Sequence, residues 1–72
     1  MEISDHDIIR CDEIVVNLEV NNAIYVELWN EFLIERVKVK SAEAAMILAG
    51  KLYKYKEELH GDQVTKISTR ND

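Results

Sequence analysis

The chain has 72 residues, a formal net charge of −5 and a hydrophobic fraction of 47%, which together predict one small globular domain over residues 1–72. No apolar run is long enough to cross a membrane, and the single Cys11 excludes an intrachain disulfide. The N-terminus is acidic and lacks the apolar segment of a signal peptide, so we expect a cytoplasmic protein. A core of this size stabilises a fold only weakly, and association with a partner would add to it.

The charges are unevenly distributed along the chain. Residues 1–35 hold nine acidic residues and one basic residue, a net charge of −8, whereas residues 36–72 hold five acidic and eight basic residues, a net charge of +3. An acidic surface attracts a basic partner and repels the phosphates of nucleic acids. We therefore expect a basic protein as partner, and we regard direct nucleic-acid binding by the N-terminal half as disfavoured. A solvated surface whose charges are separated by chance is the alternative.

The segment "ISDHDII" has the features of a helix start. Ser4 is a good N-cap, and Asp7, three residues later, completes a capping box. Ile3 and Ile8 have the spacing of a hydrophobic staple across the cap. Acidic residues in the first turn also interact favourably with the helix dipole. These features predict a short helix over residues 5–11.

Two strands are predicted next, because apolar residues alternate along the chain. Residues 14–20 and 24–28 carry aliphatic residues at every even position. Asn21 and Asn22, which lie between these segments, are typical turn residues. The pattern predicts an antiparallel hairpin whose even-numbered residues face the core.

The register of this hairpin depends on its loop. A two-residue turn would set Leu18 opposite Tyr25, on the wrong face of the second strand. A three-residue loop or a β-bulge would instead set Leu18 opposite Val26 and keep the apolar faces together. The sequence therefore favours the longer loop or the bulge.

The segment "FLIERVKVK" can be read in two ways. A tight turn at residues 30–31 predicts a third strand, in which Leu28 pairs with Leu33. This register places Glu35 on the buried face, where an acid does not fit, and a helix over residues 27–37 is the alternative. The alternation of valine and lysine in "VKVK" favours the strand.

The longest predicted element follows Ser41, a good N-cap, and ends before Gly61, a typical C-terminal cap. It is an amphipathic helix of about 18 residues. Its apolar face is formed by Ala45, Leu48, Ala49, Leu52, Tyr55 and Leu59. The predicted fold is therefore α+β: a three-stranded antiparallel meander packed on a long C-terminal helix, with a short N-terminal helix and a possible short final strand within residues 63–69.

The outer face of this sheet is predicted to be a binding surface. Its apolar centre would be surrounded by acidic residues, which is the anatomy of a protein interface, and Trp29 would be its dominant contact. Coverage of this face by the N-terminal helix is the alternative. The predicted partner-binding residues are Tyr25, Trp29, Phe32, Ile34, Glu13, Glu19, Glu27, Glu31 and Glu35.

The sequence contains no catalytic or cofactor motif. His6, Asp7 and Cys11 lie close together along the chain, but they lack the spacing of a zinc site. Pairing of Cys11 with His6 or His60 as a nucleophile and base has no further support. No glycine-rich loop is present to bind phosphate. We therefore expect neither an enzyme nor a metal or cofactor site.

In size, acidity and element order the chain resembles small acidic inhibitor proteins of phages and mobile elements, including some anti-CRISPR proteins. The resemblance covers the whole chain, from "SDHDIIRCDE" through the strands "IVVNLEV" and "AIYVELW" to the helix "AEAAMILAGKLYKYKEEL". No specific motif is shared, so no functional residue is carried over. The resemblance implies an inhibitor that occupies a nucleic-acid-handling protein where phosphates would otherwise bind.

The leading hypothesis is a non-catalytic protein-binding module that occludes a basic, nucleic-acid-handling host protein. A homodimer or small assembly subunit that uses the same face is the first alternative. A nucleic-acid binder acting through the basic C-terminal half is the second alternative. The cations expected to act in this way are Arg36, Lys38, Lys40, Lys51, Lys54 and Lys56.

Overall fold

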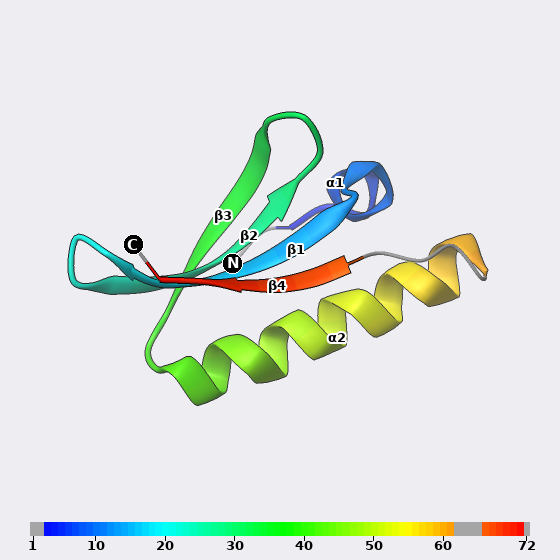
Figure 1. Cartoon of the computed structure of the whole chain (residues 1–72). Helices are drawn as coiled ribbons and strands as arrows, with labels where there is room; N and C mark the ends of the chain where they lie inside the picture. The colour runs from blue at the N-terminus through cyan, green and yellow to red at the C-terminus, as the bar shows by residue number, and fades with distance from the viewer. Residues whose placement is uncertain (1–2, 62–65, 72) are drawn as a thin grey trace.

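The computed structural model describes residues 3–61 and 66–71, and it has the predicted α+β architecture. Four strands form one mixed sheet in the order β3-β2-β1-β4, with α2 along one face (Figure 1). Along the chain the elements are α1 (Asp5–Arg10), β1 (Glu13–Val20), β2 (Ala23–Trp29), β3 (Leu33–Val39), α2 (Ala42–His60) and β4 (Lys66–Arg70). The meander and the long helix are confirmed, and residues 27–37 are not helical.

Both helices begin at the predicted caps. The Ser4 hydroxyl accepts a hydrogen bond from the Asp7 amide at 3.2 Å, and the Ser41 hydroxyl accepts one from the Ala44 amide at 3.0 Å. These bonds satisfy amide groups that have no partner within the helix. Helix α2 ends at Gly61, whose φ of 77° lies in the left-handed region that glycine tolerates.

The β1–β2 hairpin combines a two-residue turn with a β-bulge. Asn21 and Asn22 both have positive φ values, 53° and 63°, as a type I′ turn requires. The register then shifts between Asn17 and Val20, where β1 contains one residue more than β2. The predicted three-residue loop is thus wrong and the predicted bulge is confirmed, because the bulge lets Leu18 pack against the core.

The β2–β3 pairing differs from the predicted register by two residues. Leu28 pairs with Glu35 and not with Leu33, which is paired with Trp29. Ile34 is the extra residue of a second bulge, and it packs against the core. A two-residue shift preserves the parity of the strand, so Glu35 still shares the face of Leu28, half-buried at the sheet edge.

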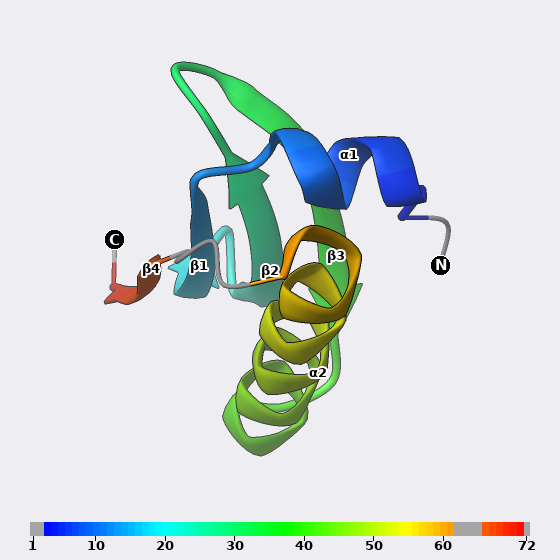
Figure 2. The same ribbon diagram turned by 90° about the vertical axis from the view of Figure 1, so that its right-hand side faces the viewer.

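The core lies between the sheet and α2, on the face predicted from the even-numbered residues. Helix α1 packs against α2 at the same core, as the view along the sheet shows (Figure 2). Neither described helix is apolar and long enough to cross a membrane. The buried core residues are Ile8, Cys11, Ile14, Val16, Val26, Leu28, Ala45, Ala49 and Leu52.

Two details of the helices differ from the sequence prediction. Tyr55 and Leu59, which were predicted on the buried face of α2, are exposed, and Lys56 is buried instead. Helix α1 contributes Ile8 to the core on the α2 side. The alternative in which α1 covers the outer face of the sheet is therefore wrong.

Strand β4 extends the sheet beyond β1. It runs parallel to β1, with Glu13 opposite Lys66 and Asn17 opposite Arg70. The predicted final strand is thus present over Lys66–Arg70, whereas residues 62–65 lie outside the described part of the chain. The parallel pairing makes β1 an interior strand, which agrees with its almost completely buried centre.

Candidate partner-binding surface

The structure separates the predicted binding residues into two surfaces. Tyr25, Glu27 and Trp29 lie on the sheet face opposite α2, which no helix in the described part of the chain covers. We call this surface the open face. Glu31, Phe32 and Ile34 line a hollow at the α1 end of the molecule, which we call the end hollow.

Glu27 lies at the centre of the open face and is completely buried. Its carboxylate accepts a hydrogen bond from the Trp29 indole N–H at 2.8 Å and another from Asn17 Nδ2 at 3.3 Å. Arg36 Nε lies 2.8 Å from the same carboxylate and forms an ion pair with it. Buried carboxylates require such partners, so Glu27 organises the surface and is itself inaccessible to a binding partner.

Two cation–ring pairs flank Glu27 on the open face. The Arg36 guanidinium lies over the Tyr25 ring, 5.0 Å from its centroid. The Arg70 guanidinium lies over the Trp29 ring at 5.5 Å. Both distances are within the range of a cation–π interaction. The half-buried rings are therefore held in place by arginines from the two edge strands.

The remaining predicted acids do not form one acidic surface. Glu13 is half-buried and accepts a hydrogen bond from the Ser68 hydroxyl. Glu35 lies on the α2 side of the sheet and accepts a hydrogen bond from the Arg36 amide at 3.0 Å. The side chain of Glu19 lies outside the described part of the structure. Among the predicted acids whose side chains the structure describes, Glu31 is the exposed one.

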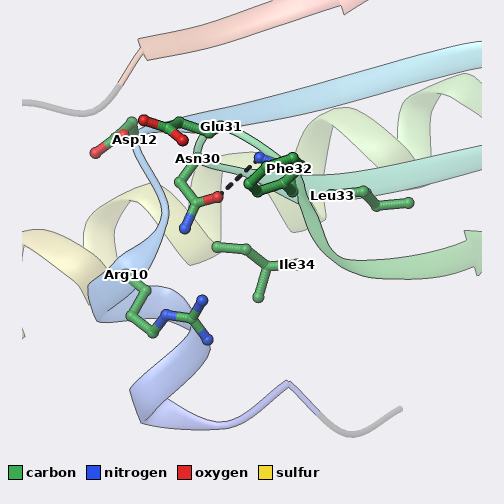
Figure 3. Close-up of a pocket in the computed structure, with 7 residues that line it drawn as sticks. All are labelled: Arg10, Asp12, Asn30, Glu31, Phe32, Leu33 and Ile34. Carbon is green, nitrogen blue, oxygen red and sulfur yellow. Dashed lines mark hydrogen bonds between the residues drawn. The ribbon is translucent and has the colours of Figure 1, made fainter.

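The end hollow has a volume of about 510 Å³ and lies between the end of α1 and the β2–β3 turn. Figure 3 shows the carboxylates of Asp12 and Glu31 on one side, with the Arg10 guanidinium reaching in from α1. Phe32 and Ile34 provide apolar surface. The residues that line it are Arg10, Asp12, Asn30, Glu31, Phe32, Leu33 and Ile34.

Phe32 is the most exposed large apolar side chain described, with 73% of its surface accessible. Its position is fixed by the turn, because its amide donates to Asn30 Oδ1 at 2.9 Å and its carbonyl accepts from the Asn30 amide at 3.1 Å. The backbone of Asp12 is held by a separate hydrogen bond, in which its amide donates to the Trp29 carbonyl at 2.7 Å. Hydrogen bonds thus hold the backbone of the turn, and the exposed Phe32 lines the same hollow as the side chains of Asp12 and Glu31.

Cys11 and Lys56 are buried together beneath this end of the molecule. The Lys56 ammonium donates to the Cys11 carbonyl, and neither side chain reaches the surface. Burial raises the pKa of the Cys11 thiol, although the nearby Lys56 charge partly opposes the shift. Within residues 3–61 and 66–71, no cluster of His, Cys, Asp and Glu side chains is arranged to bind a metal ion.

We predict that Cys11 is nearly inert in the native protein. Because the thiolate is the nucleophile, alkylation by iodoacetamide at neutral pH is expected to be at least about a hundredfold slower than in urea. The matched control is an Ile9→Cys variant in a Cys11→Ala background, which places a thiol at an exposed position of α1. Equal labelling rates for Cys11 in the native and unfolded states would contradict its burial.

Sequence reasoning missed three contributors to these surfaces. Arg10 and Asp12 line the end hollow because α1 ends beside the β2–β3 turn, a long-range contact without a local sequence signal. Arg70 reaches Trp29 because β4 pairs with β1. In the segment "KISTR", Lys66, Ser68 and Arg70 occupy alternate positions, which could have predicted a strand with these polar residues on one face. The sequence pattern could not have predicted that this strand pairs with β1.

Comparison with family models, curated protein sequences and solved structures found no match to this chain.

Proposed function

We propose that the protein is a non-catalytic binding module that docks a basic segment of another protein in the end hollow. The observation that carries this proposal is Phe32, an exposed aromatic ring beside the carboxylates of Asp12 and Glu31. Aromatic residues dominate binding energy when a partner desolvates them, and flanking charges favour partners of the opposite sign.

The wider surface at this end supports a basic partner. Asp5 and Asp7 lie in α1, and the hydrogen bond from the Tyr55 hydroxyl to Asp5 at 2.9 Å places this helix beside the C-terminal half of α2. That half of α2 exposes Glu57 and Glu58 but also Lys51 and Lys54, so its exposed charges balance. The acidic character lies in Asp5 and Asp7 of α1 and in the hollow itself, where Asp12 and Glu31 outnumber the lining cation Arg10. A lysine- or arginine-rich segment with one apolar side chain fits this chemistry.

A basic segment of this kind is typical of proteins that handle nucleic acids. Occupying it would block access of phosphates by steric and electrostatic means. This role, inhibition of a nucleic-acid-handling protein, is the biochemical function that we propose. The supporting features are the exposed Phe32, the flanking carboxylates and the uneven charge distribution of the chain.

We predict that Phe32→Ala weakens partner binding by at least about thirtyfold, which corresponds to the loss of about 2 kcal/mol at a hot spot. Because Phe32 is exposed, the substitution should change the free energy of unfolding by less than about 0.5 kcal/mol. Glu31→Gln should have a smaller effect that disappears at high salt, since the charge of Glu31 acts through solvent.

The test is affinity capture from extract of the source cells with the wild-type protein as bait, followed by titration of the captured protein. The matched control is Ile47→Ala, which removes an apolar side chain that is 52% exposed on α2 and does not line the end hollow. A captured basic protein that loses affinity with Phe32→Ala but not with Ile47→Ala supports the proposal. A partner that binds both variants equally contradicts it.

A second copy of this chain is the competing occupant of the end hollow. Light scattering at micromolar concentration distinguishes it, because a dimer would have twice the monomer mass of 8.4 kDa. If the protein is a dimer and Phe32→Ala dissociates it, the occupant of the end hollow is a second copy of this chain and not the proposed basic protein. A monomer at these concentrations leaves the hollow available to a different protein.

A further inference from the structure

Among the side chains that the structure describes, those of the open face carry a net charge opposite to that of the whole chain. The register places cations of β3 and β4 on the same face as the aromatic rings of β2: Lys38 pairs with Tyr25, and Arg36 pairs with Glu27. On the other edge, Lys66 and Arg70 pair with Glu13 and Asn17. The exposed cations of the open face are Arg36, Lys38, Lys66 and Arg70.

The carboxylates of the open face do not cancel this charge at its surface. Glu27 is completely buried and bonded to Trp29, Asn17 and Arg36. Glu13 is half-buried and bonded to the Ser68 hydroxyl. Among the side chains that the structure describes, the exposed acids lie in α1, at Asp12 between α1 and β1, in the β2–β3 turn and on α2. A ligand that approaches the open face therefore meets ammonium and guanidinium groups first.

The aromatic rings and guanidinium planes form one layer across the sheet. The Arg36 guanidinium lies over the Tyr25 ring from β3, and the Arg70 guanidinium lies over the Trp29 ring from β4. The carboxylate of Glu27 fixes both the Trp29 indole and Arg36, so the layer is ordered before any ligand binds. Unstacked bases bind to aromatic rings and to arginine planes, while lysines and arginines at the rim neutralise phosphates.

We infer that the open face binds single-stranded nucleic acid, with bases stacked on the Tyr25–Arg36 and Trp29–Arg70 pairs and phosphates on the flanking lysines. This inference is independent of the end hollow, because it uses the opposite charge and a different surface. The sequence argued against nucleic acid because acids dominate residues 1–35. In the fold, β2 of that half lies between cations contributed by β3 and β4.

The cation set differs from the one suggested by the sequence. Arg36 and Lys38 belong to the open face, and Lys66 and Arg70 join them. Lys56 is buried, and Lys51 and Lys54 are exposed on α2, which packs on the other side of the sheet. The two α2 lysines therefore provide a control within the same chain, because they carry equal charge at a different location.

The experiment titrates the full chain with short single-stranded DNA and RNA of equal sequence, at low salt, and follows the fluorescence of Trp29. Trp29 is the single tryptophan of the chain, so a stacked base is expected to quench its emission directly. With three or four phosphates neutralised, a fourfold rise in salt concentration should weaken binding by about 20- to 50-fold. Quenching by either nucleic acid with this salt dependence supports the inference.

Two charge-reversed variants identify the surface. Lys38→Glu with Arg70→Glu should weaken binding at least about tenfold, because two cations of the open face become anions. Lys51→Glu with Lys54→Glu makes the same charge change on α2 and should weaken binding much less. Far-UV circular dichroism and urea midpoints verify that both variants fold. Equal losses in the two variants would overturn the inference.

Two further ligands separate stacking from charge alone. Polyphosphate carries phosphates without bases, and polyglutamate is an anionic polypeptide. Neither should quench Trp29 at concentrations at which the oligonucleotide does. Equal affinity for polyphosphate or polyglutamate would overturn the inference in favour of a general anion-binding face, and so would the absence of oligonucleotide binding to the wild-type protein at low salt.

Discussion

Replacing Glu27 by alanine is expected to lower the free energy of unfolding by about 3 kcal/mol. The substitution removes a buried carboxylate that accepts hydrogen bonds from Trp29, Asn17 and Arg36. The Trp29 N–H and the Arg36 guanidinium then lose their shared acceptor. The effect is smaller than for a fully buried ion pair, because the Arg36 side chain is 39% exposed and water can solvate it.

The measurement is urea unfolding, followed both by Trp29 fluorescence and by circular dichroism, since the variant changes the surroundings of the indole itself. Glu27→Gln keeps the volume and one carbonyl acceptor, so its loss should be intermediate. Glu31→Ala is the matched control, because it removes the same side chain from an exposed turn and should cost less than about 0.5 kcal/mol. A loss below about 1 kcal/mol for Glu27→Ala would show that the network is not a stabilising one.

Replacing Leu28 by alanine is expected to cost about 3 to 4 kcal/mol, for a different reason. Leu28 is the neighbour of Glu27 in β2, but it points to the other face and is completely buried in the core with α2. The variant loses apolar burial and leaves a cavity. A domain of this length has a total stability of about 4 to 11 kcal/mol, so Leu28→Ala removes between about a third and all of it.

The matched control for this prediction is Leu33→Ala. Leu33 is the same residue type in the next strand, but it is 37% exposed and is absent from the core cluster. Its loss should be below about 1 kcal/mol. Thermal and urea unfolding of the two variants, compared with the wild type, measure the difference. Similar losses at Leu28 and Leu33 would contradict the placement of the core on one face of the sheet.

The elements determined by local patterns were predictable from the sequence. The two serine caps and the alternation in β1 and β2 depend on residues close in the chain, and they gave the helix starts and the buried face. Even the bulge in the first hairpin could be predicted, because a two-residue turn alone would set the apolar Leu18 opposite Tyr25, on the face away from the core. These features need no knowledge of the tertiary contacts.

The candidate surfaces were less predictable, because they depend on long-range contacts. Ile34 was expected on the outer face, but the second bulge shifts the register and places it against the core. Phe32 was expected beside Trp29, but it lies in the turn and lines the end hollow. Glu27 was expected to be a solvent-exposed acid at a binding interface. Its burial depends on hydrogen bonds from Trp29, two residues further along β2, and from Arg36 in the neighbouring strand β3.

The parallel pairing of β4 with β1 has a consequence for the order of folding. The hairpins β1–β2 and β2–β3 close over short loops, whereas Glu13 and its partner Lys66 lie far apart along the chain. Loop closure over that distance is entropically expensive, so the two hairpins and α2 are expected to form the folding nucleus and β4 to dock after it. Substitutions in β4 should therefore accelerate unfolding and leave the folding rate nearly unchanged. Any ligand held by Arg70 would then slow unfolding by retaining the strand that leaves first.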